Sequence, residues 1–179
     1  MMLELTADLV RAEGVALDRA DLLYGWEHGV IGPEAVIELA SDEIGRGCDD
    51  DLVMALGCLL ADDADRVREI LGPPGVESSE ELSGGSTDAS AARKWLYLEM
   101  RALYLARDRA ADPLSEVEDL YCDFGHPDSI AGLVRWMPLR PGEQPGEDAI
   151  MRRWQSFLES EHDILIVDVI PGASDGGRD

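Results

Sequence analysis

Two short motifs carry side chains that could bind a metal ion. Glu159 and His162 form a Glu-x-x-His pair of the kind used in di-iron helix bundles. Glu116 and Asp119 form a Glu-x-x-Asp step like those of metal-dependent helical nucleotide hydrolases. Each chemistry needs a second such motif on a facing helix, because one motif supplies too few ligands. The sequence offers one of each and no partner, so a metal-dependent hydrolase with clustered carboxylates is only the alternative function. No catalytic residue, metal site or cofactor is assigned.

Four carboxylates recur at helical spacing in the second half of the chain. Steps of four, three and four residues place them on one face of a helix: Asp112, Glu116, Asp119 and Asp123. Such a face can bind the Lys and Arg side chains of a basic partner, and these four residues are the predicted binding site. The alternative is that they form the solvated side of an ordinary amphipathic helix.

The charge of the chain limits its partners. Its 179 residues contain 15 Lys plus Arg and 38 Asp plus Glu, which gives a formal net charge of −23. A chain this acidic repels nucleic acid and anionic membranes and attracts basic proteins. The alternative is that the charge serves solubility alone.

The cysteines and the N-terminus favour a cytoplasmic location. Cys48, Cys58 and Cys122 are odd in number and contain no close pair, which argues against a disulfide framework and for a reducing compartment. The first residues lack the basic start and apolar run of a signal peptide. No stretch approaches the roughly 20 apolar residues of a membrane-spanning helix.

The chemistry-bearing residues must be positioned by helices, because apolar residues recur every three to four positions almost throughout. Helices are predicted at 3–13, 18–29, 32–45, 49–60, 62–71, 91–110, 112–125, 127–138 and 147–161. Asp18, Asp88 and Asp112 are predicted N-caps, and Gly125 a helix end. We expect the inward faces to include Leu105, the residues Ile130, Leu133, Val134 and Met137 of 127–138, and all four tryptophans, Trp26, Trp95, Trp136 and Trp154.

These helices predict an all-α fold, an irregular multi-helix stack of helical hairpins. Residues 1–170 are predicted to form a single domain with an exposed loop at 72–88, which is rich in Gly, Pro and Ser. The segment 164–170 (ILIVDVI) is β-branched and is expected as a short strand or, preferably, as an apolar strap over the helices. Residues 171–179 are expected to be a disordered tail.

Three segments together resemble a family of small bacterial proteins known as a domain of unknown function. They are residues 26–40, 94–138 and 152–161, about half of the chain, and the run DPLSEVEDLYCDFGHPDSIAGLVRWMP is the most specific part. The resemblance implies a soluble bacterial helical domain. It brings no catalytic residues, so no site residue is carried over.

Charge and the lack of catalytic motifs favour a non-enzymatic function. We expect an acidic protein-binding module that neutralises a basic protein partner, such as a toxin or effector, and that binds neither nucleic acid nor membrane. The immunity-type role rests on analogy with other short acidic helical proteins of bacterial toxin systems, and not on a motif.

Overall fold

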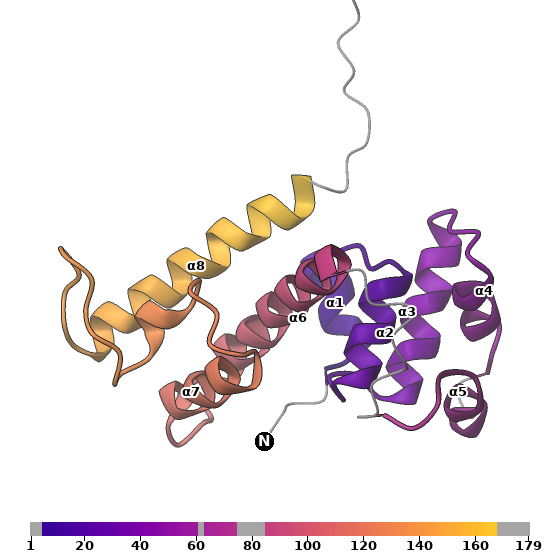
Figure 1. Cartoon of the computed structure of the whole chain (residues 1–179), viewed down its shortest axis with the longest axis horizontal. Helices are drawn as coiled ribbons and strands as arrows, with labels where there is room; N and C mark the ends of the chain where they lie inside the picture. The colour runs from indigo at the N-terminus through magenta and orange to yellow at the C-terminus, as the bar shows by residue number, and fades with distance from the viewer. Residues whose placement is uncertain (1–4, 61–62, 75–84, 168–179) are drawn as a thin grey trace, which may run out of the picture.

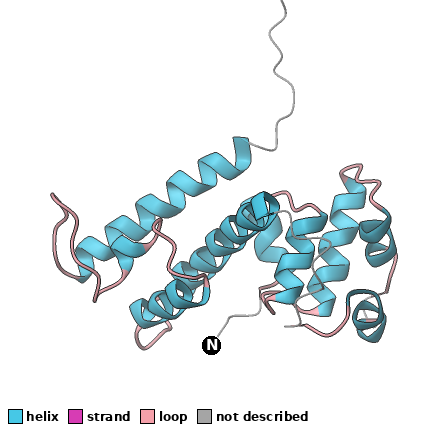
Figure 2. Cartoon of the chain, viewed as in Figure 1, coloured by secondary structure: helices cyan, strands magenta, loops and turns pink. Residues whose placement is uncertain are grey.

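The computed structural model describes residues 5–60, 63–74 and 85–167, and within them the predicted all-α fold is confirmed (Figure 2). No strand occurs in these ranges, where Leu5 and Ile31 form one isolated β-bridge. The helices are α1 (Ala7–Glu13), α2 (Arg19–Glu27), α3 (Pro33–Gly45), α4 (Asp51–Gly57), α5 (Ala64–Leu71), α6 (Gly85–Ala106), α7 (Pro113–Asp123), the 3-10 helix η1 (Ala131–Leu133) and α8 (Glu147–Val167).

Helix α6 is the central element of the fold. It packs against α1 and α2 on one side and against α7 and α8 on the other. Figure 1 shows it running obliquely between the group α1–α5 and the group formed by α7 and α8. Its side chains Trp95, Tyr97, Leu98 and Met100 are each no more than 1% exposed, so α6 joins both groups through one core.

The observed helix starts follow from local cap chemistry. Asp18 caps α2 in a capping box with Asp21, and Asp112 caps α7 by accepting from the amide of Ser115 at 3.1 Å. Pro33 and Pro113 occupy first-turn positions, where a missing N–H costs nothing. The prediction that Asp88 is an N-cap was wrong, because α6 already begins at Gly85 and Asp88 lies in its first turn.

The contact between α2 and α6 contains a buried ion pair and a close backbone approach. The carboxylate of Asp21, which is 2% exposed, accepts from Nζ of Lys94 at 2.5 Å. The indole of Trp95 donates to the carbonyl of Asp21 at 2.7 Å. A Cβ built on Gly25 would lie 2.6 Å from the Trp95 ring, so only glycine allows this contact.

Replacing Gly25 with alanine should lower the free energy of unfolding by about 1–3 kcal/mol, because the fully buried Trp95 ring cannot move away. Gly45 provides the control, since a Cβ there meets no atom within 4 Å. Urea unfolding of Gly25→Ala, Gly45→Ala and the parent measures the difference. Equal stability of the two variants would show that α2 and α6 do not approach as closely as described.

The prediction of a helix at 127–138 was wrong. Only Ala131–Leu133 form a short 3-10 helix, and Val134 is extended. The amide of Arg135 donates to a Glu118 carboxylate oxygen at 3.1 Å, and this tertiary hydrogen bond replaces a helical one. The predicted inward side chains Ile130, Leu133 and Val134 are nevertheless buried.

Two large side chains expected in the core are at the surface. Trp136 is 56% exposed, because it lies in a turn between Val134 and Met137 and not in the predicted helix. Leu105 is 55% exposed in the last turn of α6. The other three tryptophans are core residues as predicted.

The prediction of a strand or strap at 164–170 was wrong for residues 164–167. These residues form the last turn of α8. Trp154, Leu158 and Leu165 are all buried, at steps of four and seven residues. This helical stripe continues through the β-branched run and outweighs its strand propensity. Residues 168–170, the predicted tail 171–179 and most of the predicted loop (75–84) lie outside the described residues.

Candidate functional site: the outer face of α7

Helix α7 is fixed to the core along one side. Leu114, Val117, Leu120 and Tyr121 are buried, each 5% exposed or less. The helix ends in a left-handed turn, with φ of +70° at Gly125 and +66° at His126, whose amide donates to the Tyr121 carbonyl. Gly125 therefore ends the helix as predicted, and the side of α7 opposite the core is held in a fixed orientation.

The four predicted binding residues differ in their surroundings. Asp119 and Asp123 are exposed and Glu116 is half-buried. Within the part of the chain that the structure describes, these three carboxylates form no ion pair and no side-chain hydrogen bond. Asp112 is also exposed, but its carboxylate is already used for the helix cap and for an ion pair with Arg135 at 2.9 Å. The unpaired face therefore consists of three residues: Glu116, Asp119 and Asp123.

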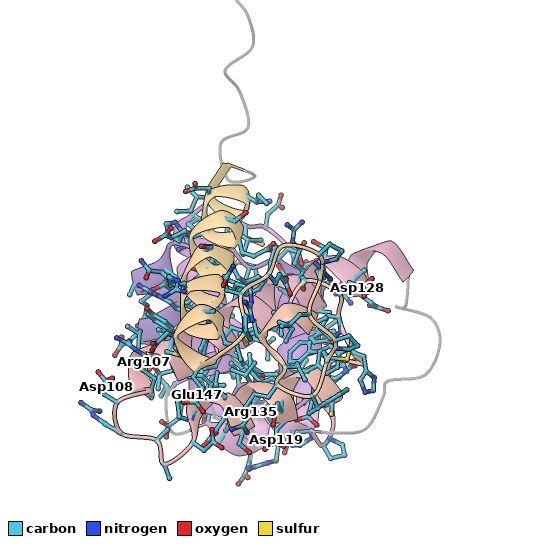
Figure 3. All side chains as sticks on the ribbon, turned by 90° about the vertical axis from the view of Figure 1, so that its left-hand side faces the viewer. Arg107, Asp108, Asp119, Asp128, Arg135 and Glu147 are labelled. Carbon is cyan, nitrogen blue, oxygen red and sulfur yellow. The ribbon has the colours of Figure 1, made fainter. Side chains whose placement is uncertain are left out.

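Arg135 clamps the flank of α7 to the following loop. Its guanidinium donates to both carboxylate oxygens of Glu118 at 3.0 Å and to Asp112 at 2.9 Å. These charge-assisted bonds hold the pKa values of the Asp112 and Glu118 carboxyls below their usual range. Figure 3 shows Asp119 and Arg135 at the same end of the molecule. Sequence reasoning missed this clamp, because nothing in the spacing of Glu118 and Arg135 indicates their contact.

An exposed aromatic side chain lies beside α7. The Trp136 ring meets the ring of Tyr121 edge-on, with centroids 5.6 Å apart, and Tyr121 in turn meets His126 at 5.0 Å. Tyr121 belongs to the buried side of the helix. The Trp136 ring thus packs against Tyr121, a core residue, while more than half of its own surface faces solvent.

A buried carboxyl stands close to the C-terminal end of this face. Glu99 of α6 is 1% exposed, and its Oε1 has no hydrogen-bond partner. Burial, and then the negative charge of Asp123, raise the pKa of Glu99 to about 8. The spacing of the sequence could have predicted this burial. Glu99 lies one turn after Trp95 and Leu96, on the apolar side of the helix.

The candidate metal motifs are placed apart. Glu159 accepts from the side-chain amide of Gln155 at 2.9 Å. Glu159 and His162 both line a cavity of about 470 Å³, together with Glu13, Tyr97 and Arg101. In that cavity Glu13 accepts from the Tyr97 hydroxyl at 2.5 Å and from Arg101 at 2.8 Å, so its carboxylate is already satisfied. Among the described residues, no three His, Cys, Asp or Glu side chains come together in a way that could hold a metal ion.

The comparison with protein families gives a match to nearly the whole described chain, whereas no curated protein and no solved structure matches it. Among the described helices, none is long and apolar enough to span a membrane. The matching family is described as "Uncharacterized protein conserved in bacteria (DUF2247)", and its model covers residues 7–162. The chain, whose described residues form a helical fold, therefore belongs to this family of bacterial proteins.

Proposed function

We propose that the protein is an acidic, non-enzymatic binding module of the bacterial cytoplasm that docks a basic protein on the outer face of α7. The observation that carries this proposal is the set of unpaired carboxylates Glu116, Asp119 and Asp123 on a helix fixed at both ends. Glu118, on the flank of the same helix, differs from these three residues because its carboxylate is paired with Arg135. The cysteines support a reducing compartment, because all three are free.

Two physical effects favour binding at this face. The net charge of −23 attracts a basic protein from a distance and raises its association rate at low salt. The fixed helix then holds the carboxylates in place, so little conformational entropy is lost when they meet Lys or Arg side chains. Clustered like charges also repel one another, and a basic partner relieves this repulsion.

Trp136 gives the surface an anchor. Exposed tryptophans are frequent among the few residues that carry most of the binding energy of an interface. The ring of Trp136 is held by Tyr121 and offers a face on which an arginine of the partner can stack. An exposed aromatic ring that is supported by α7, together with unpaired acids on the outer side of the same helix, suits an arginine-rich surface better than a neutral one.

Neutralisation of a toxin or effector is the role that we propose for this docking, by analogy with other short acidic helical proteins. In this role the module covers basic residues that the partner needs for its own activity. Metal-dependent hydrolysis remains the alternative, and no arrangement among the described side chains favours it.

Affinity capture from the bacterium that carries the gene, followed by binding measurements with the purified partner, tests the proposal. The expected partner is basic, and its affinity falls as salt rises. The double variant Glu116→Lys/Asp119→Lys should weaken binding by about tenfold or more, mainly through slower association. The fold should be retained, because neither residue belongs to the core.

The control variant is Glu34→Lys/Asp49→Lys, which changes the net charge by the same amount at exposed positions of the α3–α4 region. It should retain most of the affinity. Equal losses in the two double variants would show that only total charge matters and that α7 is an ordinary solvated helix. Capture of neutral or acidic proteins alone, with binding insensitive to salt, would contradict the proposed function as a whole.

A further inference from the structure

A cleft of about 670 Å³ lies between α8 and the loop that precedes it, separate from the outer face of α7. Its volume falls within the range of small-molecule sites. The loop contributes Ser129 and Arg140, and α8 contributes Arg152, Arg153, Ser156 and Ser160. Leu133 and Phe157 provide apolar surface in the same cleft.

The arginines of this cleft differ from almost all other cations of the chain. Every other described Lys and Arg, except Arg109, forms an ion pair with a carboxylate. Arg140, Arg152 and Arg153 form none within the described residues, although acidic residues outnumber basic ones by 38 to 15. Three unneutralised positive charges in one cleft are therefore the exception in this acidic molecule.

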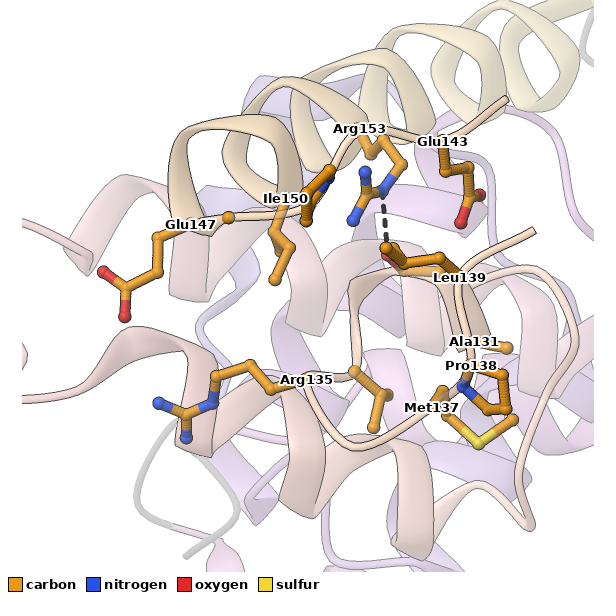
Figure 4. A pocket seen from close by; sticks show the side chains of 13 residues that line it. Ala131, Arg135, Met137, Pro138, Leu139, Glu143, Glu147, Ile150 and Arg153 are labelled. Carbon is orange, nitrogen blue, oxygen red and sulfur yellow. Dashed lines mark hydrogen bonds between the residues drawn. The ribbon is translucent and has the colours of Figure 1, made fainter. Parts of the chain in front are cut away.

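Two of these guanidinium groups are oriented by neutral partners. Arg153 donates to the carbonyl of Gly132 at 2.8 Å, a bond visible in Figure 4, and to the carbonyl of Gln144 at 2.9 Å. Arg140 donates to the carbonyl of Asp128 at 3.1 Å. Backbone carbonyls fix the direction of a guanidinium without cancelling its charge, so both groups remain available to an anion.

The carboxylates that line the cleft are already engaged. Glu161 accepts two bonds from Arg93, at 2.7 and 3.0 Å. One oxygen of Glu143 accepts from the backbone amide of Arg140 at 2.9 Å. The three arginines thus exceed the two lining carboxylates in charge, and one of those carboxylates is neutralised by Arg93.

We propose that this cleft binds a small organic phosphate. Planar guanidinium groups match the geometry of phosphate oxygens, the serine hydroxyls add hydrogen bonds, and a doubly charged phosphate suits the surplus of positive charge better than a single carboxylate. Phe157 and Leu133 provide an apolar wall for the organic part of the ligand. The overall negative charge of the protein does not prevent phosphate binding. Salt screens charges that lie more than about 8 Å away, whereas the arginines contact the ligand directly.

Calorimetric titration with three probes tests the proposal: phenyl phosphate, inorganic phosphate and benzoate. Phenyl phosphate should bind most tightly, inorganic phosphate more weakly because it lacks the apolar part, and benzoate most weakly because it carries one charge. Arg152→Ala should raise the Kd for phenyl phosphate about tenfold, which corresponds to one lost charge-assisted contact. Arg152 is exposed and has no partner in the described structure, so this variant should fold normally.

Arg109→Ala is the matched control, since Arg109 is also exposed and unpaired among the described residues but does not line the cleft. It should leave the Kd unchanged. Arg153→Lys serves as a second cleft variant that retains the charge and loses the paired geometry, and it should also weaken binding. No binding of either phosphate, tighter binding of benzoate, or equal losses for Arg109→Ala and Arg152→Ala would overturn the proposal.

Discussion

Replacing Glu99 with glutamine should stabilise the protein by about 3 kcal/mol at pH 7 and by little at pH 4. The pKa of the buried Glu99 carboxyl is about 8 in the folded protein, against a model value of 4.5. A raised folded pKa means that the contribution of Glu99 to stability is complete below pH 4.5 and is lost as the pH rises towards 8. Glutamine cannot ionise in the unfolded chain, so the variant does not lose this contribution.

Chemical denaturation of Glu99→Gln and the parent from pH 4 to pH 8 measures the effect. The difference in free energy of unfolding should grow steadily over this range. Glu159→Gln is a suitable control, because Glu159 is exposed on α8 and the new amide can still accept from Gln155. A difference that stays constant with pH would show that Glu99 is already ionised, and hence hydrated, in the folded protein.

Replacing Lys94 with methionine should cost on the order of 3 kcal/mol at pH 8, because it leaves the Asp21 carboxylate buried without its partner. The cost should be smaller at pH 5. Burial raises the pKa of Asp21 to about 6 even in the presence of Lys94, which lowers it, so the carboxyl takes up a proton at acidic pH. Unfolding curves of Lys94→Met and the parent at pH 5 and pH 8 measure the loss of stability at each pH.

The double variant Lys94→Met/Asp21→Asn separates the loss of the ion pair from the loss of packing. Asparagine can still accept from the amide of Asp18, a bond that Asp21 makes at 2.8 Å, and it carries no charge. Much of the stability lost in Lys94→Met should therefore return at pH 8. If the single variant costs the same at pH 5 and pH 8, the Asp21 carboxylate is hydrated and the pair is not buried as described.

The parts of the fold that could be predicted from the sequence are those set by local chemistry. Asp18 and Asp112 cap helices because their carboxylates reach amides three residues ahead, whatever the rest of the chain does. The inward side of α7 follows in the same way from its apolar spacing. The unpaired acids of α7 were therefore correctly placed opposite the core, while their function as a binding surface stays a proposal.

Two of the errors arose where distant residues compete with local preference. The predicted helix at 127–138 is interrupted because Glu118, on another element, accepts from the amide of Arg135. Arg135 also withdraws Asp112 from the predicted binding face, because the two side chains form an ion pair. The arginine cleft could not be predicted either, because it is defined by which cations remain without a carboxylate once the chain has folded.

In the function that we propose, the outer face of α7 steers and binds a basic protein. The most direct measurement is the association rate constant of the captured partner as a function of salt, for the parent, Glu116→Lys/Asp119→Lys and Glu34→Lys/Asp49→Lys. We expect a steep fall with salt for the parent and the control, and a slower association with a shallower salt dependence for the α7 variant. Identical salt dependence for all three proteins would contradict it.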